Sequence, residues 1–446
     1  MTPARKLRSR QETSSADRRQ ADPPLFLAEA EQRPRVRPPL VVAVIFMVMA
    51  VGAVVPRPVR IVLEFLSVAL LLAQYGTRLK RHQAAVLALI TGAMLWWTLG
   101  LLHPNVPTLA VGVVGWRKSI FALVGLGLGA TVFARHRRFL ERLIVWLLTA
   151  GIGLSIVIHI RFPGFESGVA RAAGDETGTF GGVARLQGIY PGPFHVALAA
   201  SFLVVWSCVR LRESRFVALT VLIVGLLGVH LAQVRSSYVA LALATCVFVW
   251  RQEGTSRRVR TVLAVIAAVI ALSSVASPIG QGSAFSSFSD LSGDDRLIGR
   301  FETWEAAGQL IASNPFVGHG PGSAGDTMAP EFIGADHITS HNVLLKWAVE
   351  GGAVGLLIVV AALVYVGRPL VRSRESPLDP ALAGIVVFMV FGATGAIVEA
   401  NPVSFFLATL IGAASAETRG VRVKMVPSAR VDAPPQQCPK GPHACN

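Results

Sequence analysis

The chain has 446 residues, of which 52% are hydrophobic and only 15% are charged, and its formal net charge is +16. This composition excludes an ordinary soluble domain. The net charge alone would suit nucleic-acid binding, but the basic residues gather in short links between apolar runs, as in the cytoplasmic loops of membrane proteins. We therefore expect an all-α, polytopic membrane protein with membrane lipids around it and no nucleic-acid partner.

The predicted elements begin after a polar, arginine-rich segment, residues 1–39, which we expect to be disordered and to hold no cleavable signal peptide. Apolar runs near the ~20 residues needed to cross a bilayer then recur through residues 40–416. Residues 417–446 form a second tail that is expected to be disordered. About twelve transmembrane helices are predicted, at residues 40–55, 59–75, 84–102, 112–134, 139–160, 194–209, 216–234, 237–250, 259–277, 345–366, 381–398 and 403–416.

Lysine and arginine predict the orientation of these helices. The basic links all fall on the side of the N-terminal tail, at residues 78–81, 135–138, 210–215, 251–260 and 368–374. That side is expected to be cytoplasmic, so we place both termini inside and the protein in the cytoplasmic (inner) membrane of a bacterium. Two long loops, residues 161–193 and 278–340, then lie outside, and long loops often carry function.

Cations on the outer side need a reason, because the positive-inside bias removes most of them. Arg185 lies in the first outer loop, Arg235 lies in a tight turn between two spans, and Arg300 begins an amphipathic segment. Guanidinium groups match phosphate oxygens, so these three arginines suggest an anionic lipid headgroup, such as a diphosphate. The remaining candidates are expected to solvate ordinary loops or to reach the membrane surface: Arg57, Arg60, Arg161 and Lys118.

The second outer loop is expected to contain a helix capped by Asp294 or Asp295 and ended by Asn314-Pro315. This helix either lies in the outer membrane interface or packs as a cap on the bundle. The glycine-rich segment 318–322 lacks the ending of a phosphate loop, so we expect a tight turn back toward the membrane. One apolar face of the helix is predicted to hold Phe301, Trp304, Gly308 and Ile311.

The loop ends at His341, where an apolar helix begins. Ser340 is the expected N-cap, which places His341 in the first helical turn, where the helix N-terminus disfavours a protonated ring. A neutral imidazole can accept a proton from a hydroxyl, although a structural role for the ring also stays open. Lys346 and Glu350, four residues apart on the same helix, are expected to pair.

A metal site is not expected. His337 and His341 have a spacing that suits zinc, but the helix begins too late to carry both on one face. Three further ligand-type residues lie in the C-terminal tail, for which disorder is the favoured interpretation: Cys438, His443 and Cys445.

Four short segments follow one another along the chain in a recognisable order. They are Arg-Leu-Gln-Gly-Ile-Tyr-Pro at 185–191, Arg-Ser-Ser-Tyr at 235–238, Arg-Phe-Glu-Thr-Trp at 300–304 followed by Asn-Pro-Phe-Val-Gly-His-Gly at 314–320, and His-Asn at 341–342 with Glu-Gly-Gly at 350–352. Their order and topology resemble the O-antigen ligase and polysaccharide polymerase (Wzy-type) membrane glycosyltransferases over roughly residues 40–416. Two segments depart from the family: the turn has Arg-Ser-Ser where relatives often have Ser-Arg-Gly, and the first loop has Tyr-Pro-Gly-Pro where relatives often have Asn-Pro-Asn.

The resemblance implies transfer of a glycan from a polyprenyl-diphosphate carrier to an acceptor hydroxyl of a glycan or lipid on the outer face, without a cofactor or a metal. Carried over to this chain, Arg235 and Arg300 bind the leaving diphosphate, and His341 deprotonates or orients the acceptor hydroxyl. The further expected substrate-binding residues are Arg185, Asn342, Tyr238, Trp304 and Glu350.

Three functions fit the sequence: a polysaccharide polymerase, a ligase, and a transporter or lipid flippase. Polymerisation of surface polysaccharide repeats is slightly favoured, because the Arg-, Ala- and Val-rich composition fits a bacterium without lipopolysaccharide; ligation to a different acceptor is the alternative. Flippase or chain-length proteins would be partners. A transporter or lipid flippase would need an internal repeat and ionisable residues in mid-membrane, where Glu64 is the best candidate and is expected to stand alone.

Overall fold

The structure is a computed structural model. It describes residues 40–51, 57–75, 80–134, 136–173, 179–180, 183–211, 213–251, 295–325, 338–373 and 380–425. The expected span 259–277 and the first expected tail, residues 1–39, lie outside these residues, and so does His337. The second expected tail, residues 417–446, is described only to residue 425, and there the expectation of disorder is wrong, because the last helix continues to Met425.

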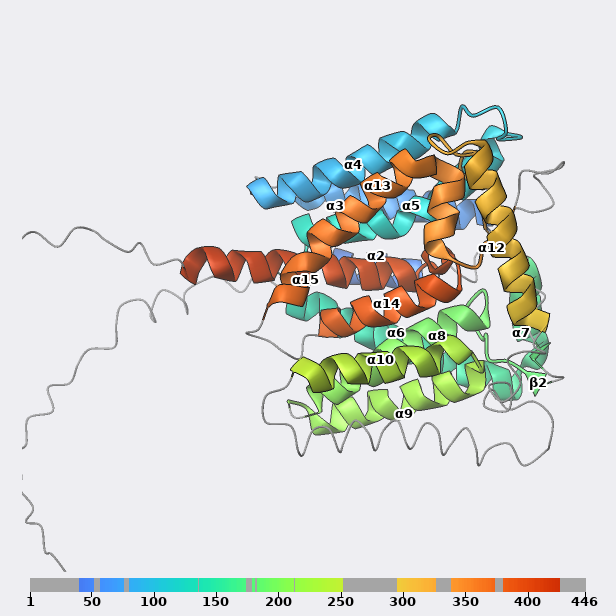
Figure 1. The fold of residues 1–446 in the computed structure, drawn as a ribbon. Helices are drawn as coiled ribbons and strands as arrows, with labels where there is room; N and C mark the ends of the chain where they lie inside the picture. The colour runs from blue at the N-terminus through green and yellow to red at the C-terminus, as the bar shows by residue number, and fades with distance from the viewer. Residues whose placement is uncertain are drawn as a thin grey trace, which may run out of the picture. The chain divides into compact units, whose positions relative to one another are not determined.

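Helices account for nearly all of the described chain (Figure 1). Six of them are long and apolar enough to cross a membrane: α4 (Arg81–Gly100), α5 (Leu109–Thr131), α6 (Arg137–Arg161), α8 (Pro193–Arg210), α9 (Arg215–Ala232) and α13 (Val343–Arg372). The other bundle helices are α2 (Leu40–Val51), α3 (Arg57–Tyr75), α10 (Arg235–Arg251), α14 (Pro380–Thr394) and α15 (Val403–Met425). Every expected span except 259–277 overlaps one of these helices, while the total of twelve stays a prediction.

Smaller elements gather at one end of the bundle. They are α7 (Pro163–Ala173), the two-residue strands β1 (Thr179–Phe180) and β2 (Val183–Ala184), and α12 (Asp295–Ser313). The strands pair antiparallel and are the exception to the expected all-α class among the described residues. Figure 1 shows α7, β2 and α12 at the same end, which we call the α12 end. Both sequence-predicted long loops therefore contribute to this end.

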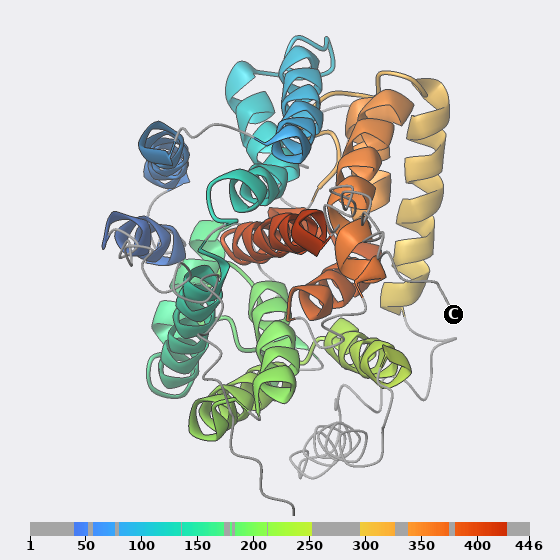
Figure 2. The same ribbon diagram turned by 90° about the vertical axis from the view of Figure 1, so that its left-hand side faces the viewer.

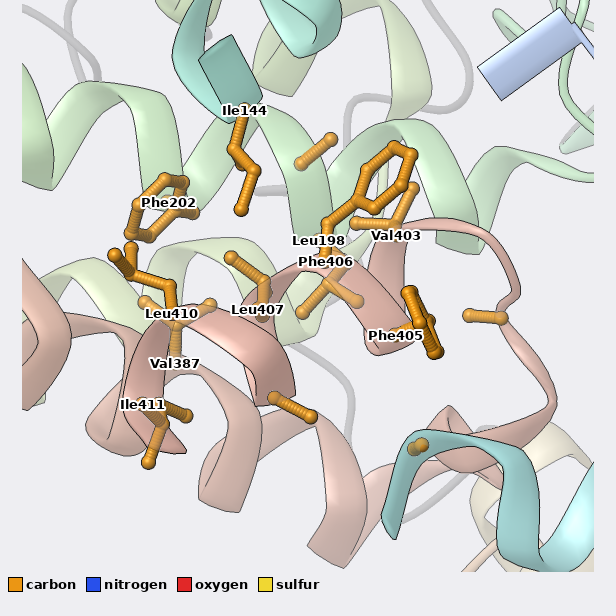
Figure 3. Packing of buried hydrophobic residues seen from close by; sticks show 14 of the residues in the cluster. Ile144, Leu198, Phe202, Val387, Val403, Phe405, Phe406, Leu407, Leu410 and Ile411 are labelled. Carbon is orange, nitrogen blue, oxygen red and sulfur yellow. The ribbon is translucent and has the colours of Figure 1, made fainter. Parts of the chain in front are cut away.

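The centre of the bundle is the contact between α5 and α15, and Figure 2 shows α15 surrounded by other helices. Glycines let the two backbones touch: a Cβ added at Gly129 would lie 2.8 Å from the carbonyl carbon of Thr409. In lipid there is no hydrophobic driving force between helices, so their association depends on close van der Waals packing, which small residues at the contact allow. Figure 3 shows Phe405, Phe406 and Leu410 of α15 among the buried side chains that fill the surrounding space.

Charges inside the bundle are paired, which corrects two expectations. Glu64 on α3 does not stand alone: its carboxylate accepts from Nε and Nη2 of Arg117 on α5, the latter at 2.6 Å, and both side chains are buried. Lys118 is not at the surface but buried, with its Nζ 3.3 Å from Glu399 Oε2. A lone charge in lipid is costly, so residues far apart in sequence neutralise one another here. Arg161 is exposed, as expected.

Candidate functional site

Arg235 begins α10 directly after a tight turn at the α12 end. The turn is possible because Gln233, the residue after α9, takes the left-handed conformation with φ 50°. The next side chain, Ser236, lies 2.6 Å from the Thr394 hydroxyl at the end of α14, measured between the two oxygens. Half-buried Arg235 is therefore held where α9, α10 and α14 meet.

The segment that starts at Arg185 fastens this turn. The Arg185 Nε donates to the Ala232 carbonyl at 3.1 Å, and the Leu186 N–H donates to the Leu231 carbonyl at 2.9 Å. Both acceptors are last-turn carbonyls of α9, which have no partner within the helix. The structure thus places Arg185, expected to bind substrate, beneath the turn that carries Arg235, with 8% of its surface exposed.

Glu166 on α7, which no sequence pattern singles out, supports that segment. Its Oε1 accepts from the backbone N–H groups of Gln187 and Gly188 at 2.5 and 2.7 Å, and its Oε2 lies 2.7 Å from His159 Nδ1. Burial would raise the pKa of Glu166, but the His159 and backbone hydrogen bonds outweigh it and hold the pKa below its ordinary value. In the sequence, nothing beyond the acidic side chain of Glu166 in an outer loop indicated that it supports this segment.

His341 lies just before α13 rather than in its first turn, which corrects the expected cap. The N-cap is Asn342, whose Oδ1 accepts from the N–H groups of Leu344 and Leu345 at 2.9 and 3.2 Å. His341 itself has φ 45°, a left-handed conformation that is uncommon outside glycine and often marks functional residues. Ser340 instead donates to the Asn342 carbonyl at 3.1 Å.

Asn342 also ties the segment that carries His341 to the helix end that supports the Arg235 turn. Its Nδ2 donates to the Ala393 carbonyl at 3.3 Å, next to the Thr394 hydroxyl that contacts Ser236. The end of α14 is therefore a shared support for the residues that follow Arg235 and His341 directly in the chain. This contact places the segments that carry Arg235 and His341, more than a hundred positions apart in the sequence, at the same end of α14.

Arg300 on α12 completes the group, because its charge acts on His341. Burial, then the positive charge of Arg300, lowers the pKa of His341 below its ordinary value, and the negative charge of Glu399 opposes this change. The ring is thus neutral at neutral pH, as the sequence predicts, but for a different reason. Burial and a neighbouring arginine replace the expected effect of a helix N-terminus.

The packed face of α12 agrees with the predicted one only in part. Ile311 does pack against the cluster of Ala307, Ala324, Ile338 and Val349, in which Ala307 is fully buried. Phe301, in contrast, is 63% exposed, and Gly308 is also exposed. The helix does end at Ser313, just before Asn314-Pro315, as predicted.

Two expected substrate-binding aromatic residues have partly buried positions. Trp304 on α12 has a buried Nε1 with no hydrogen-bond partner among the described residues, and its ring meets Phe301 edge-on at 5.5 Å between centroids. Tyr238 on α10 packs against the main hydrophobic core. The structure places Tyr238 one helical turn from Arg235, and Trp304 one turn from Arg300.

Helix α13 is broken at Gly352, which has φ 61°. A break within an apolar helix leaves backbone groups that need partners, because lipid offers none. The loop after α12 supplies them: the N–H groups of His319 and Gly320 donate to the carbonyls of Val349 and Glu350 at 2.8 and 3.0 Å. The predicted tight turn at 318–322 and the Glu-Gly-Gly segment at 350–352 are therefore one structural unit.

Gly352→Ala is expected to destabilise the protein by about 1–3 kcal/mol, the usual cost of forcing a residue into a disfavoured conformation. The new Cβ would also lie 2.6 Å from the backbone nitrogen of Val317. The thermal unfolding of detergent-solubilised variants measures this effect. Gly367→Ala in the same helix is the matched control, because its Cβ would meet nothing within 4 Å. Equal melting temperatures for the two variants would contradict the prediction.

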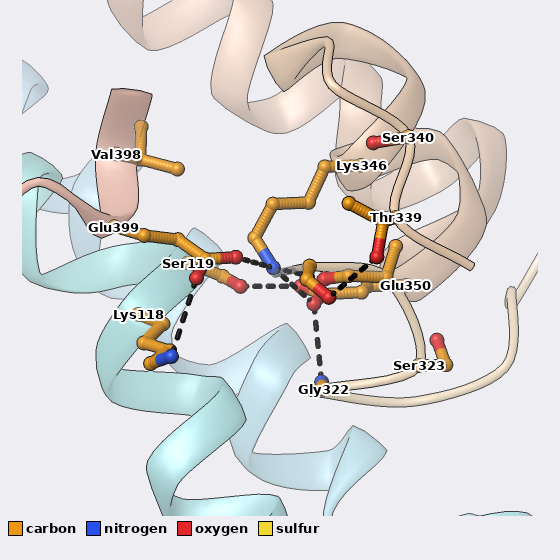
Figure 4. A network of polar contacts seen from close by, with 12 residues as sticks. Lys118, Ser119, Gly322, Ser323, Thr339, Ser340, Lys346, Glu350, Val398 and Glu399 are labelled. Atoms are coloured by element: carbon orange, nitrogen blue, oxygen red, sulfur yellow. Dashed lines mark hydrogen bonds and ion pairs between the residues drawn. The ribbon is translucent and has the colours of Figure 1, made fainter. Parts of the chain in front are cut away.

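A buried polar network lies beside this break (Figure 4). Glu350 Oε1 accepts from Lys346 Nζ at 2.6 Å, which confirms the expected pair, and from the Gly322 N–H at 3.1 Å. Its Oε2 accepts from Trp97 Nε1 at 3.2 Å and from the Ser119 hydroxyl. The structure therefore places Glu350, expected to bind substrate, among protein donors and only 2% exposed.

Residues 219–360 match the family model described as O-antigen ligase. Over this range the chain is similar to O-antigen ligases. The matched range contains Arg235, Arg300 and His341 and three of the four sequence segments, and it confirms the resemblance there, while the segment at 185–191 lies outside it. No curated protein matches the chain. The match to the O-antigen ligase family and the apolar helices together support a membrane enzyme that acts on glycans.

Proposed function

We propose that this protein transfers a glycan from a polyprenyl diphosphate to an acceptor hydroxyl on the outer face of the cytoplasmic membrane, and that it polymerises polysaccharide repeat units. The observation that carries the proposal is that the residues directly after Arg235 and His341 both bond to the end of α14, with Arg300 close enough to act on the histidine. In this proposal the α12 end faces outward, and both termini are cytoplasmic.

The reaction needs two kinds of group, and the site has both. The acceptor oxygen attacks the anomeric carbon while the bond from that carbon to the diphosphate oxygen breaks, and the neutral ring of His341 takes the acceptor proton. The bonding electrons leave with the diphosphate, whose growing charge is stabilised by Arg235 and Arg300. A lipid-bound donor held in one orientation also lowers the entropic cost of the reaction.

The pH dependence of transfer follows from the environment of His341. The neutral ring is the active form, so transfer should be constant above the pKa of His341 and fall below it. Because burial and Arg300 lower that pKa, the fall should occur below the pH at which an ordinary histidine titrates. Arg300→Gln removes one cause and should move the fall to higher pH. A pH–rate profile of purified protein tests this, and an unmoved profile would contradict it.

The identity of the acceptor can be tested by measuring the size of the lipid-linked glycans that accumulate in cells that lack the gene. Accumulation of single repeat units on the polyprenyl carrier would support the polymerase. Accumulation of long lipid-linked chains would support the alternative, a ligase that transfers finished glycan to another acceptor. An unchanged pool on the outer face would contradict both and favour a transporter or lipid flippase. Flippase and chain-length proteins are proposed partners in either enzymatic case.

A further inference from the structure

The polar network beside His341 contains more charge than the proposed chemistry uses. Its ionic members are Lys118 on α5, Lys346 and Glu350 on α13, and Glu399 in the short helix η4 (Ile397–Glu399), and each is at most about a tenth exposed. Buried ion pairs cost desolvation and are weak contributors to stability on their own. Charged groups this deep in an apolar bundle therefore suggest a further role.

One role is visible in the chain that leads to His341. Lys346 Nζ donates to the Ala324 carbonyl, and residues 323–325 pair with Ile338: the Gly325 N–H donates to the Ile338 carbonyl at 2.9 Å, and the Ile338 N–H donates to the Ser323 carbonyl at 3.0 Å. His341 follows only three residues later. The ammonium group of Lys346 thus holds the segment that positions the histidine.

Glu399 in turn holds Lys346. Its Oε1 lies 3.1 Å from Lys346 Nζ, and its Oε2 lies 3.3 Å from Lys118 Nζ. The space is closely filled, since a Cβ at Gly325 would lie 2.9 Å from Lys346 Nζ. Glu399 also follows α14 by a few residues, and the end of α14 binds Asn342. Glu399 is therefore linked to the His341 segment through Lys346, whose contact with Glu399 is drawn in Figure 4, and it also lies a few residues after the helix end that binds Asn342.

We propose that Glu399 is a positioning residue for the transfer reaction: it fixes Lys346 and the segment before His341, and its negative charge stabilises the histidine ring once that ring has taken the acceptor proton. This inference rests on the proposed function. Transfer without Glu399 would leave a protonated ring exposed to the positive charge of Arg300 on α12, with no opposing carboxylate in η4.

Glu399→Gln should lower kcat about tenfold, leave the KM for the lipid-linked donor within about twofold, and move the acidic fall of the pH–rate profile to lower pH. The sign follows because Glu399 raises the pKa of His341. Glu399→Asp should restore part of kcat. Glu141→Gln is the matched control: it is a buried carboxylate bound to Trp206 and Arg210 near the start of α6, at the opposite end from the site.

A double variant guards against loss of folding. Lys118→Met with Glu399→Gln removes both members of an ion pair, so no uncompensated buried charge remains from that pair. It should unfold at nearly the wild-type temperature and still show the lower kcat. If Glu399→Gln folds and its kcat and pH profile are unchanged, this inference is overturned. Transfer by the wild type in the same assay would leave the proposed function intact in that case. Absence of transfer by the wild type would instead overturn the proposed function and, with it, the role of Glu399.

Discussion

Replacement of His341 by alanine should reduce glycan transfer by about 10²–10⁴-fold, the range expected for loss of a general base, without unfolding the protein. The ring lies before α13 and is not part of the buried core, so its removal leaves no core cavity. His341→Asn is the sharper variant. Asparagine tolerates the left-handed conformation found at this residue but cannot act as a base.

The assay is transfer of a labelled polyprenyl-diphosphate glycan by purified protein, with thermal unfolding measured on the same samples. His82→Ala, which removes a histidine at the opposite end of α4 from the site, is the control and should keep wild-type transfer. Full activity of His341→Ala or His341→Asn would remove this residue from the mechanism and leave its unusual backbone conformation as a structural feature only.

Arg235→Ala should have the second large effect, a loss of about 10²–10³-fold in kcat, because in the proposed mechanism it removes the charge that stabilises the leaving diphosphate. Donor binding should weaken as well, since in that mechanism the guanidinium also binds the diphosphate before reaction. Arg235→Lys should recover only part of the activity, because an ammonium keeps the charge but cannot form the forked hydrogen bonds of a guanidinium.

The same transfer assay, at several donor concentrations, separates the effect on KM from that on kcat. Arg215→Ala is the matched control: this arginine begins α9, is exposed, and lies at the opposite end of that helix from the turn that carries Arg235. Wild-type kcat and KM in the Arg235→Ala variant would show that the anion is held elsewhere, and Arg300 would then be the first residue to examine.

Several local features could be predicted from the sequence because they depend on near neighbours. Hydropathy over about twenty residues predicts where helices lie, and the four-residue spacing of Lys346 and Glu350 predicts their pair. The stop of α12 before Asn314-Pro315 is equally local. The candidate residues Arg235, Arg300 and His341 also came from the sequence, through charge on an unexpected side and through the resemblance.

Errors arose where a residue's role depends on distant partners. Glu64 was expected to stand alone, but Arg117 on another helix neutralises it. Lys118 was expected at the surface, but Glu399 binds it inside the bundle. The N-cap before α13 was shifted by two residues, because Asn342 also bonds to α14. In each case a contact between helices outweighed a local preference.

The sequence alone therefore determined the helical membrane class and where the described helices lie, because periodicity, composition and charge act over short stretches of chain, and it supplied the candidate residues Arg235, Arg300 and His341. Only the tertiary structure decided that Arg235 and His341 share the end of α14, that the break in α13 is filled by the loop after α12, and that Glu399 lies beneath the site. These contacts join segments far apart in the chain. They depend on burial, because a polar group or a charge inside an apolar bundle is stable only when it is paired. The spacing of residues in the sequence does not show which group is the partner.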